Sequence, residues 1–147
     1  MRSPNDKIRH RAEFLARRCD GHEVRSVIIT MLYDMEIPLN NCGFSYLKDA
    51  VEVAFSRRSV VVVKEIFDEV GEMYVPSVEY SAMDSGIRGV VQKAWYNRKN
   101  DRWDYYFPEY ILSRKHPPSN AEVLTAMVYF LDMWQSCCKG GVKSAGK

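Results

Sequence analysis

The sequence predicts an all-α fold. Apolar residues recur every three or four positions along most of the chain, the spacing that places them on one face of a helix. No stretch carries the alternation and turn signals that would pair it with another as strands, and no internal repeat appears. With 147 residues, 46% of them hydrophobic and 12% aromatic, the chain has the size and composition of one domain with a substantial core.

Three helices are predicted in the first third of the chain. The first spans 8–19, where the apolar positions are Ile8, Ala12, Leu15 and Cys19. The second spans 24–35 and carries a strict apolar stripe that stops before Ile37-Pro38. Because Pro, Asn and Gly favour turns, 38–43 is predicted to be a loop. The third helix follows it and places on one face Leu47, Ala50, Val51, Ala54 and Phe55.

The run Val60–Val63 is compatible with a strand or with a buried helix, because β-branched residues occur in both. Apolar residues after it continue at helical spacing between charged ones. We therefore predict one helix from Ser59 to Met73, followed by a Pro-bearing connector from Tyr74 to Tyr80.

A second helix is predicted from Ser81 to Tyr96. Ser81 with Asp84 three residues later has the form of a capping box, in which side chains satisfy the free backbone N–H groups of a helix start. The predicted buried face consists of Met83, Ile87, Val90, Val91, Ala94 and Trp95. Two short helices on a tight corner suggest a helix-turn-helix, whose second helix would enter a DNA groove.

The last third of the chain is predicted to hold one long helix. Asn97 to Asn100 ends the preceding helix, Trp103 to Phe107 is expected to form one short turn, and Pro108 to Pro118 is a connection. Ser119 and Glu122 repeat the capping pattern before a final helix whose apolar positions are Val123, Ala126, Met127, Phe130 and Trp134. The neighbouring aromatic residues would suit stacking on single-stranded nucleic acid, but in an all-α domain we expect them in the core; they are Trp95, Trp103, Tyr105, Tyr106 and Phe107.

Net charge is only +2, but it is unevenly distributed. Residues 1–25 carry seven Lys/Arg against four Asp/Glu, and 136–147 carry three lysines and no acid, which leaves −4 on 26–135. Attraction for phosphates must therefore come from the termini or from a local patch.

The chain offers no recognisable catalytic, metal or cofactor site, so we expect neither an enzyme nor a small-molecule substrate. No nucleophile or ligand lies at a diagnostic spacing from the histidines, which are His10, His22 and His116. Paired spacing typical of zinc or disulfides is missing from the cysteines, which are Cys19, Cys42, Cys137 and Cys138. No apolar run reaches the ~18 residues of a membrane span and no signal peptide is apparent, so we expect a cytoplasmic protein.

Four segments occur in a recognisable order between Val24 and Trp134. They are Gly43-Phe44-Ser45-Tyr46-Leu47-Lys48-Asp49-Ala50-Val51, Ser81-Ala82-Met83-Asp84-Ser85-Gly86-Ile87-Arg88, Ala94-Trp95 and Pro118-Ser119-Asn120-Ala121-Glu122. In this order the chain resembles the C-terminal DNA-binding (effector) domain of stage 0 sporulation protein A, the response regulator that initiates sporulation. The resemblance implies a compact six-helix domain in which the third and fourth helices form the helix-turn-helix. It also implies a bacterial transcription regulator that binds double-stranded DNA at the nucleoid.

The resemblance divides the chain into three parts. A basic, helical extension occupies 1–22, the DNA-binding domain 23–135, and a disordered basic tail 136–147, where Gly, Ser and Lys prevail. Full-length members of the family place a phospho-accepting receiver domain before this module. Residues 1–23 are too short to hold one, so we expect a regulator that is not controlled by its own aspartyl phosphorylation.

The resemblance also predicts which residues meet DNA. Arg88 matches a base-reading arginine, whereas Ser85 replaces a second arginine and Gly89 a polar side chain. The predicted base-reading residues are Ser81, Asp84, Ser85, Arg88 and Gln92. Arginine reads guanine and glutamine reads adenine, each with ~1–3 kcal/mol of discrimination. Phosphate contacts are predicted for the basic cluster just past this face, which comprises Lys93, Tyr96, Arg98, Lys99 and Arg102.

Each of these roles has an alternative. Arg88 follows Asp84 by four residues and can be a simple helix ion pair, and charges at a helix C-terminus favour its dipole without any ligand. The arginines of the first helix can form a DNA arm or the solvated side of a helix that docks on the domain or on a second copy. The weakened recognition face and acidic middle leave open a protein-interaction module that binds a full-length regulator or RNA polymerase, with little or no DNA binding.

Overall fold

The computed structural model describes residues 6–18, 23–58, 61–99 and 101–145. This part of the chain is helical and contains no strand, which confirms the all-α prediction. Its elements in chain order are α1 (Asp6–Arg18), α2 (Val24–Asp34), α3 (Cys42–Arg57), α4 (Val63–Glu72), α5 (Tyr80–Tyr96), the short 3-10 helix η1 (Arg102–Tyr105), α6 (Glu109–Leu112) and α7 (Asn120–Ala145).

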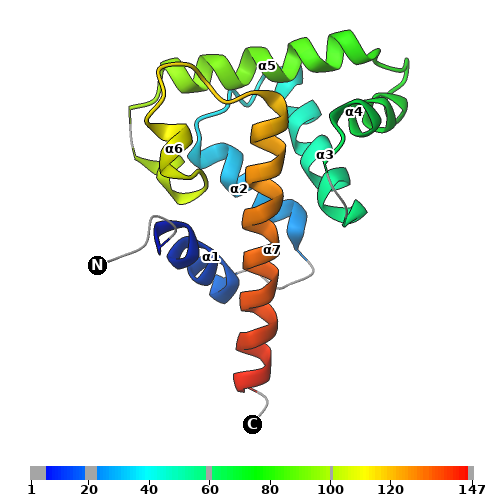
Figure 1. Ribbon diagram of the computed structural model, residues 1–147. Coiled ribbons are helices and arrows are strands. Elements are labelled where there is room, and N and C mark those ends of the chain that lie inside the picture. Colours follow the sequence, from blue (N-terminus) through cyan, green and yellow to red (C-terminus); the bar gives the residue numbers. More distant parts are fainter. Residues whose placement is uncertain (1–5, 19–22, 59–60, 100, 146–147) are drawn as a thin grey trace.

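The helix α5 lies across one end of the molecule, at the top of Figure 1, and the other elements are arranged beneath it. The helices α3 and α4 pack against α5 from beneath, and α7 starts beside Asp84 of α5 and descends towards the C-terminus. Within the described residues, α2 to α7 provide the six helices that the resemblance implies, and α4 and α5 are the third and fourth of them. None of the described helices is both long and apolar enough to cross a membrane.

One core runs through all of these elements. Ile8, Ala12 and Leu15 of α1 are buried in it, so the predicted first helix is confirmed and docks on the domain, mainly against α7 and η1. Most of the aromatic residues expected in the core are buried there, namely Trp95, Trp103, Tyr106 and Phe107, and Tyr105 is partly buried. The prediction of a core role is therefore confirmed, and a stacking platform for single strands is not formed by these residues.

The helix-turn-helix begins later than the sequence predicted. The helix α4 starts at Val63 instead of Ser59, because Val61 and Val62 are not helical and Val62 is extended, with φ −116° and ψ 100°. β-Branched side chains favour this conformation when nothing packs them onto a helix face. Residues 59–60 lie outside the described part of the chain.

The capping box predicted at Ser81 is wrong. The helix α5 starts one residue earlier, after Glu79, and no side chain caps it. Tyr80 packs near Phe67 of α4, with the ring centroids 5.8 Å apart. This contact favours a helical conformation at Tyr80, which becomes the first residue of α5. Asp84 therefore does not cap α5, and its carboxylate bonds instead to Arg88 and Asn120.

The C-terminal part is more helical than predicted. The connection 108–118 contains the short helix α6, and α7 continues to Ala145, so the disordered tail predicted for 136–147 is wrong as far as residue 145. The helix α7 packs against α1, and burial along α7 extends to the partly buried Cys137 and the buried Cys138. Each residue added to a helix that is already nucleated gains a backbone hydrogen bond, which favours its continuation. Residues 146–147 are not described.

Gly43 and Gly86 allow α3 and α5 to cross at close range. A Cβ atom on Gly43 would lie 2.3 Å from the carbonyl oxygen of Gly86 and 2.7 Å from Cγ1 of Val90. A Cβ atom on Gly86 would lie 3.0 Å from the ring of Tyr46. No larger residue fits at Gly43 unless the two helices move apart, so this crossing fixes the height of α5 above α3.

Gly71 has a corresponding role at the corner between α4 and α5. Its carbonyl accepts the N–H of Val78 at 3.0 Å, and a Cβ atom on it would lie 2.1 Å from the carbonyl oxygen of Val78. The hydroxyl of Tyr74 donates to Oδ2 of Asp49 on α3 at 2.7 Å. Backbone contact thus sets the corner, and a side-chain hydrogen bond ties it to α3.

Gly43→Ala is expected to lower the free energy of unfolding by about 1–3 kcal/mol, because overpacking a buried contact forces α3 or α5 to move. The matched control is Gly89→Ala on the outward side of α5, where no atom lies within 4 Å of a Cβ. Helix propensity alone should raise the free energy of unfolding there by about 0.8–1 kcal/mol. Urea unfolding followed by circular dichroism measures both variants, and a harmless Gly43→Ala would contradict the close crossing.

Candidate nucleic-acid interface

The outward side of α5 is a continuous exposed stripe. The inner face predicted from the periodicity is buried throughout, at Met83, Ile87, Val90, Val91, Ala94 and Trp95. On the opposite side, the exposed members of the predicted base-reading set are Ser81, Ser85, Arg88 and Gln92. None of the described helices lies above α5 in Figure 1. The structure therefore brings these four residues together on an unobstructed helix face.

Asp84 lies beside this stripe and orders Arg88. A guanidinium Nη2 of Arg88 donates to Oδ2 of Asp84 at 2.5 Å, and the side-chain amide of Asn120 on α7 donates to Oδ1 at 2.9 Å. The Asp84 side chain is 17% exposed and that of Arg88 55%. The ion pair expected from the spacing is confirmed, and the guanidinium stays accessible, so the pair does not exclude contact with DNA.

The predicted phosphate-contacting residues lie in different settings. Lys93, Tyr96 and Lys99 are exposed, Tyr96 by 66%. The guanidinium of Arg98 instead stacks on the ring of Trp95, 3.6 Å from its centroid. One of its Nη atoms is buried and has no hydrogen-bond partner among the described residues. Arg98 thus adds positive charge at the end of α5 from a position held against the core.

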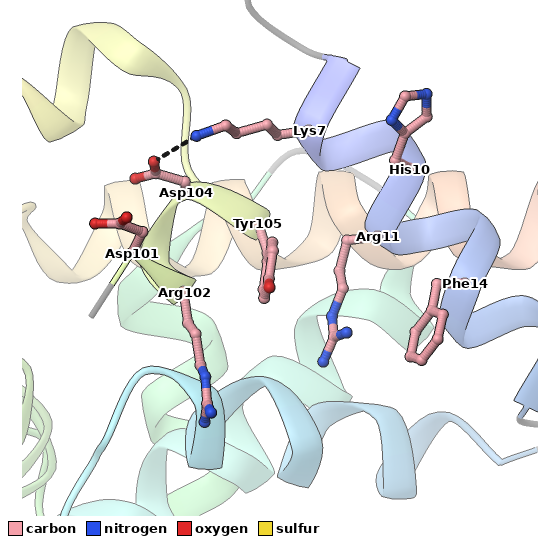
Figure 2. A pocket seen from close by; sticks show the side chains of 8 residues that line it. All are labelled: Lys7, His10, Arg11, Phe14, Asp101, Arg102, Asp104 and Tyr105. Carbon is pink, nitrogen blue, oxygen red and sulfur yellow. Dashed lines mark hydrogen bonds and ion pairs between the residues drawn. The ribbon is translucent and has the colours of Figure 1, made fainter.

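Arg102 points towards α2, as Figure 2 shows. Its Nη1 lies 3.8 Å from Oδ1 of Asp34, whose side chain is only 8% exposed. The same carboxylate accepts hydrogen bonds from Arg11 of α1, at 2.8 Å, and from the hydroxyl of Tyr106. Burial raises the pKa of Tyr106, and the hydrogen bond to Asp34 raises it further. Arg102 is therefore directed into a junction of α1, α2 and η1 instead of along the exposed stripe of α5.

A cavity of about 590 Å³ opens beside this junction, between α1 and η1 (Figure 2). Its charges are balanced by neighbours: Lys7 donates to Asp104 at 3.0 Å, and the guanidinium of Arg11 lies 4.6 Å from the ring centroid of Tyr105 in addition to its contact with Asp34. The cavity lies where α1 meets η1, beside the larger contact that α1 makes with α7. Of the alternatives for the arginine-bearing first helix, the structure has a helix that docks on the domain and exposes its other side to solvent.

The exposed apolar corner of the helix-turn-helix was missed by the sequence reasoning. Met73 is 58% and Val75 98% exposed in the connector between α4 and α5. Tyr74 and Val78 in the same connector pack against the core, so the sequence carried no signal that separates them from the exposed Met73 and Val75. The corner adds an apolar surface next to the start of α5.

The described residues contain no group of three His, Cys, Asp or Glu placed to hold a metal ion. Cys42 is exposed, Cys137 partly buried and Cys138 buried, and none of these three forms a disulfide within the described residues. Cys19 and His22 lie outside the described residues.

A charged cap fixes the first turn of α7. Ser119 N–H donates to Oε1 of Glu122 at 2.9 Å, and Glu122 N–H donates to Oγ of Ser119 at 3.2 Å, which confirms the predicted capping box. Arg114 donates to both carboxylate oxygens of Glu122, at 2.9 and 3.0 Å. These hydrogen bonds, that of Arg114 first, lower the pKa of Glu122 from 4.5 to about 2.

The family model described as the C-terminal domain of sporulation initiation factor Spo0A matches residues 28–131. The matched stretch begins within α2 and ends within α7, and so includes the helix-turn-helix and the cap of α7. Among curated proteins and among solved structures, none matches the chain significantly.

Because the pKa of Glu122 is lower in the folded than in the unfolded chain, the cap stabilises the fold above about pH 4.5, and this stability is lost as the pH falls towards 2. Glu122→Gln should therefore lose less free energy of unfolding than the wild type between pH 4.5 and 2. Urea unfolding at several pH values measures the difference. Arg114→Met removes the main cause of the shift and should flatten the curve similarly, whereas parallel curves for all three proteins would contradict the assignment.

Proposed function

The chain belongs to the family of the C-terminal domain of sporulation initiation factor Spo0A, and from this membership we propose that it regulates transcription by placing α5 in the major groove of double-stranded DNA. The family consists of DNA-binding effector domains of a sporulation response regulator. The observation that carries the proposal for this chain is the unobstructed, exposed stripe of α5. A major groove about 12 Å wide accommodates one α-helix.

The residues of the stripe suit the reading of base edges. Arg88 has a planar pair of donors for O6 and N7 of guanine, and Gln92 can pair with N6 and N7 of adenine. Ser81 and Ser85 are short and exposed, which fits contacts at close approach. Asp84 takes part through Arg88, because both of its carboxylate oxygens are engaged within the protein.

The phosphate contacts in this proposal fall mainly to Lys93, Tyr96 and Lys99, which are exposed at the end of α5. Arg98 and Arg102 contribute positive potential from positions held by Trp95 and Asp34. With so few phosphate contacts and an acidic middle section, affinity should be modest and sensitive to salt. The protein would act at the nucleoid in the bacterial cytoplasm, without a cofactor or catalytic activity.

A second function is favoured by the apolar corner of the helix-turn-helix. Met73 and Val75 are exposed beside a recognition face with few long side chains. In this alternative the domain binds a full-length regulator or RNA polymerase through the corner and touches DNA little or not at all. The two functions differ in what Arg88 does, which the following experiment measures.

Arg88→Ala should lower affinity for the preferred duplex by about 1–3 kcal/mol and relax selectivity at one base position, because a bidentate contact is lost. The preferred sequence is selected from a randomised duplex pool, and affinities are measured by fluorescence anisotropy. The matched control is Arg25→Ala, which removes another exposed, ion-paired arginine, held by Glu52 on the α2–α3 side of the molecule. If the wild type enriches no sequence and the two variants behave alike, the DNA-reading function fails and the interaction module is preferred.

Replacing both Lys93 and Lys99 by Ala should weaken binding to all duplexes about equally and reduce the salt dependence. Each lost phosphate contact lowers the slope of log K against log[salt] by about 0.9. Anisotropy titrations between about 50 and 200 mM KCl measure the slope. The control is Lys115→Ala, which removes an exposed lysine near α6. An unchanged slope in the double variant would exclude Lys93 and Lys99 as phosphate contacts.

A further inference from the structure

We propose that Asn120 is a positioning residue for Arg88, so that the first residue of α7 determines how sharply α5 discriminates at one base position. This inference rests on the proposed function and adds a residue that lies outside the recognition helix. It follows from a chain of contacts that runs from α7 through Asp84 to the exposed guanidinium.

The side chain of Asn120 is held between two helices. Asn120 is 7% exposed, and its side-chain nitrogen lies 3.1 Å from the backbone carbonyl oxygen of Asp84 and 2.9 Å from its Oδ1. A side-chain amide has two hydrogens to donate, so one nitrogen can serve both acceptors. The amide is thereby tied to the backbone as well as to the carboxylate of Asp84, which leaves the carboxylate little freedom to rotate.

The two oxygens of Asp84 have separate partners. Oδ1 accepts from Asn120, and Oδ2 accepts from Arg88 at 2.5 Å. Fixing one oxygen from the buried side fixes the direction in which the other is presented. The guanidinium of Arg88 is therefore ordered from beneath before any DNA is present.

Ordering the Arg88 side chain before DNA binds matters, because this side chain is long and exposed. A rotamer-rich side chain that must be immobilised on binding costs about 0.5–1.5 kcal/mol, and a preorganised one avoids much of this cost. The benefit appears only where the guanidinium must adopt one geometry, which is bidentate contact with a base. Contacts with phosphates tolerate many geometries, so Asn120 should affect base selectivity and leave the salt dependence unchanged.

The amide at Asn120 is also chemically specific. An aspartate of the same shape would place an acceptor against the carboxylate of Asp84, where like charges repel. An alanine would leave Oδ1 of Asp84 without its donor at a site of low exposure, free to turn with Arg88. Both changes should loosen Arg88 without altering any group that could touch DNA directly.

A double-mutant cycle between Asn120→Ala and Arg88→Ala tests the proposal. Affinities are measured for the preferred duplex and for a duplex changed at the base position that Arg88→Ala relaxes. Asn120→Ala should reduce the ratio of the two affinities about two- to tenfold, the equivalent of ordering one long side chain, with the salt slope unchanged. The double variant should discriminate no worse than Arg88→Ala alone, because Asn120 has no guanidinium left to position once Arg88 is removed.

Two further variants keep the test decisive. Glu122→Gln alters the same turn of α7 without touching Asp84, so it should leave the ratio unchanged even if it lowers stability. Asp84→Asn breaks the ion pair at a partly exposed position and should reduce the ratio as Asn120→Ala does, which answers the question if Asn120→Ala fails to fold. If Arg88→Ala changes the ratio but Asn120→Ala and Asp84→Asn do not, or if their effects multiply with that of Arg88→Ala, the positioning role is overturned and DNA reading stands. If Arg88→Ala itself changes nothing, both proposals fall.

Discussion

The position of α5 depends on the crossing of α3 beneath it at Gly43 and Gly86. Two helices meet there with a backbone oxygen where a side chain would otherwise lie, and the burial of the inner face of α5 follows from that close approach. A glycine in a helix costs about 0.8–1 kcal/mol relative to alanine, and at Gly86 this cost is offset by packing. The corner at Gly71 sets the start of α5 in the same way, through backbone contact with Val78.

A second constraint is the buried carboxylate of Asp34. Removing a charge from water is expensive unless several donors surround it, and the donors here come from α1 and from the segment around η1. The matched family region begins at residue 28, yet Arg11 lies before it. In this chain α1 therefore contributes to the core of the domain and to the neutralisation of Asp34. The cavity beside α1 lies between elements that are held together by ion pairs.

The sequence predicted the helices wherever an apolar stripe lasted for two turns or more, because burial of that stripe decides their formation. It failed where a local rule competed with packing. Val62, just before α4, is extended, and Ser81 does not cap α5 because Tyr80 packs near Phe67. The helix α7 continues beyond the apolar residues that predicted it. Among the candidate site residues, exposure of the α5 stripe followed from periodicity. The directions of Arg98 and Arg102 did not, since they are set by Trp95 and Asp34, partners that no spacing rule relates to them.

Gly89 differs from Gly86, the other glycine of α5, because no atom lies within 4 Å of where its Cβ atom would be. A change at this codon would add an atom or a whole side chain to the outward stripe, and no core residue would have to adjust. Under the proposed function, a side chain at position 89 would change the surface offered to DNA, while Gly43, Gly71 and Gly86 would keep the helices in place. Close backbone packing and the outward chemistry of α5 therefore depend on different glycines.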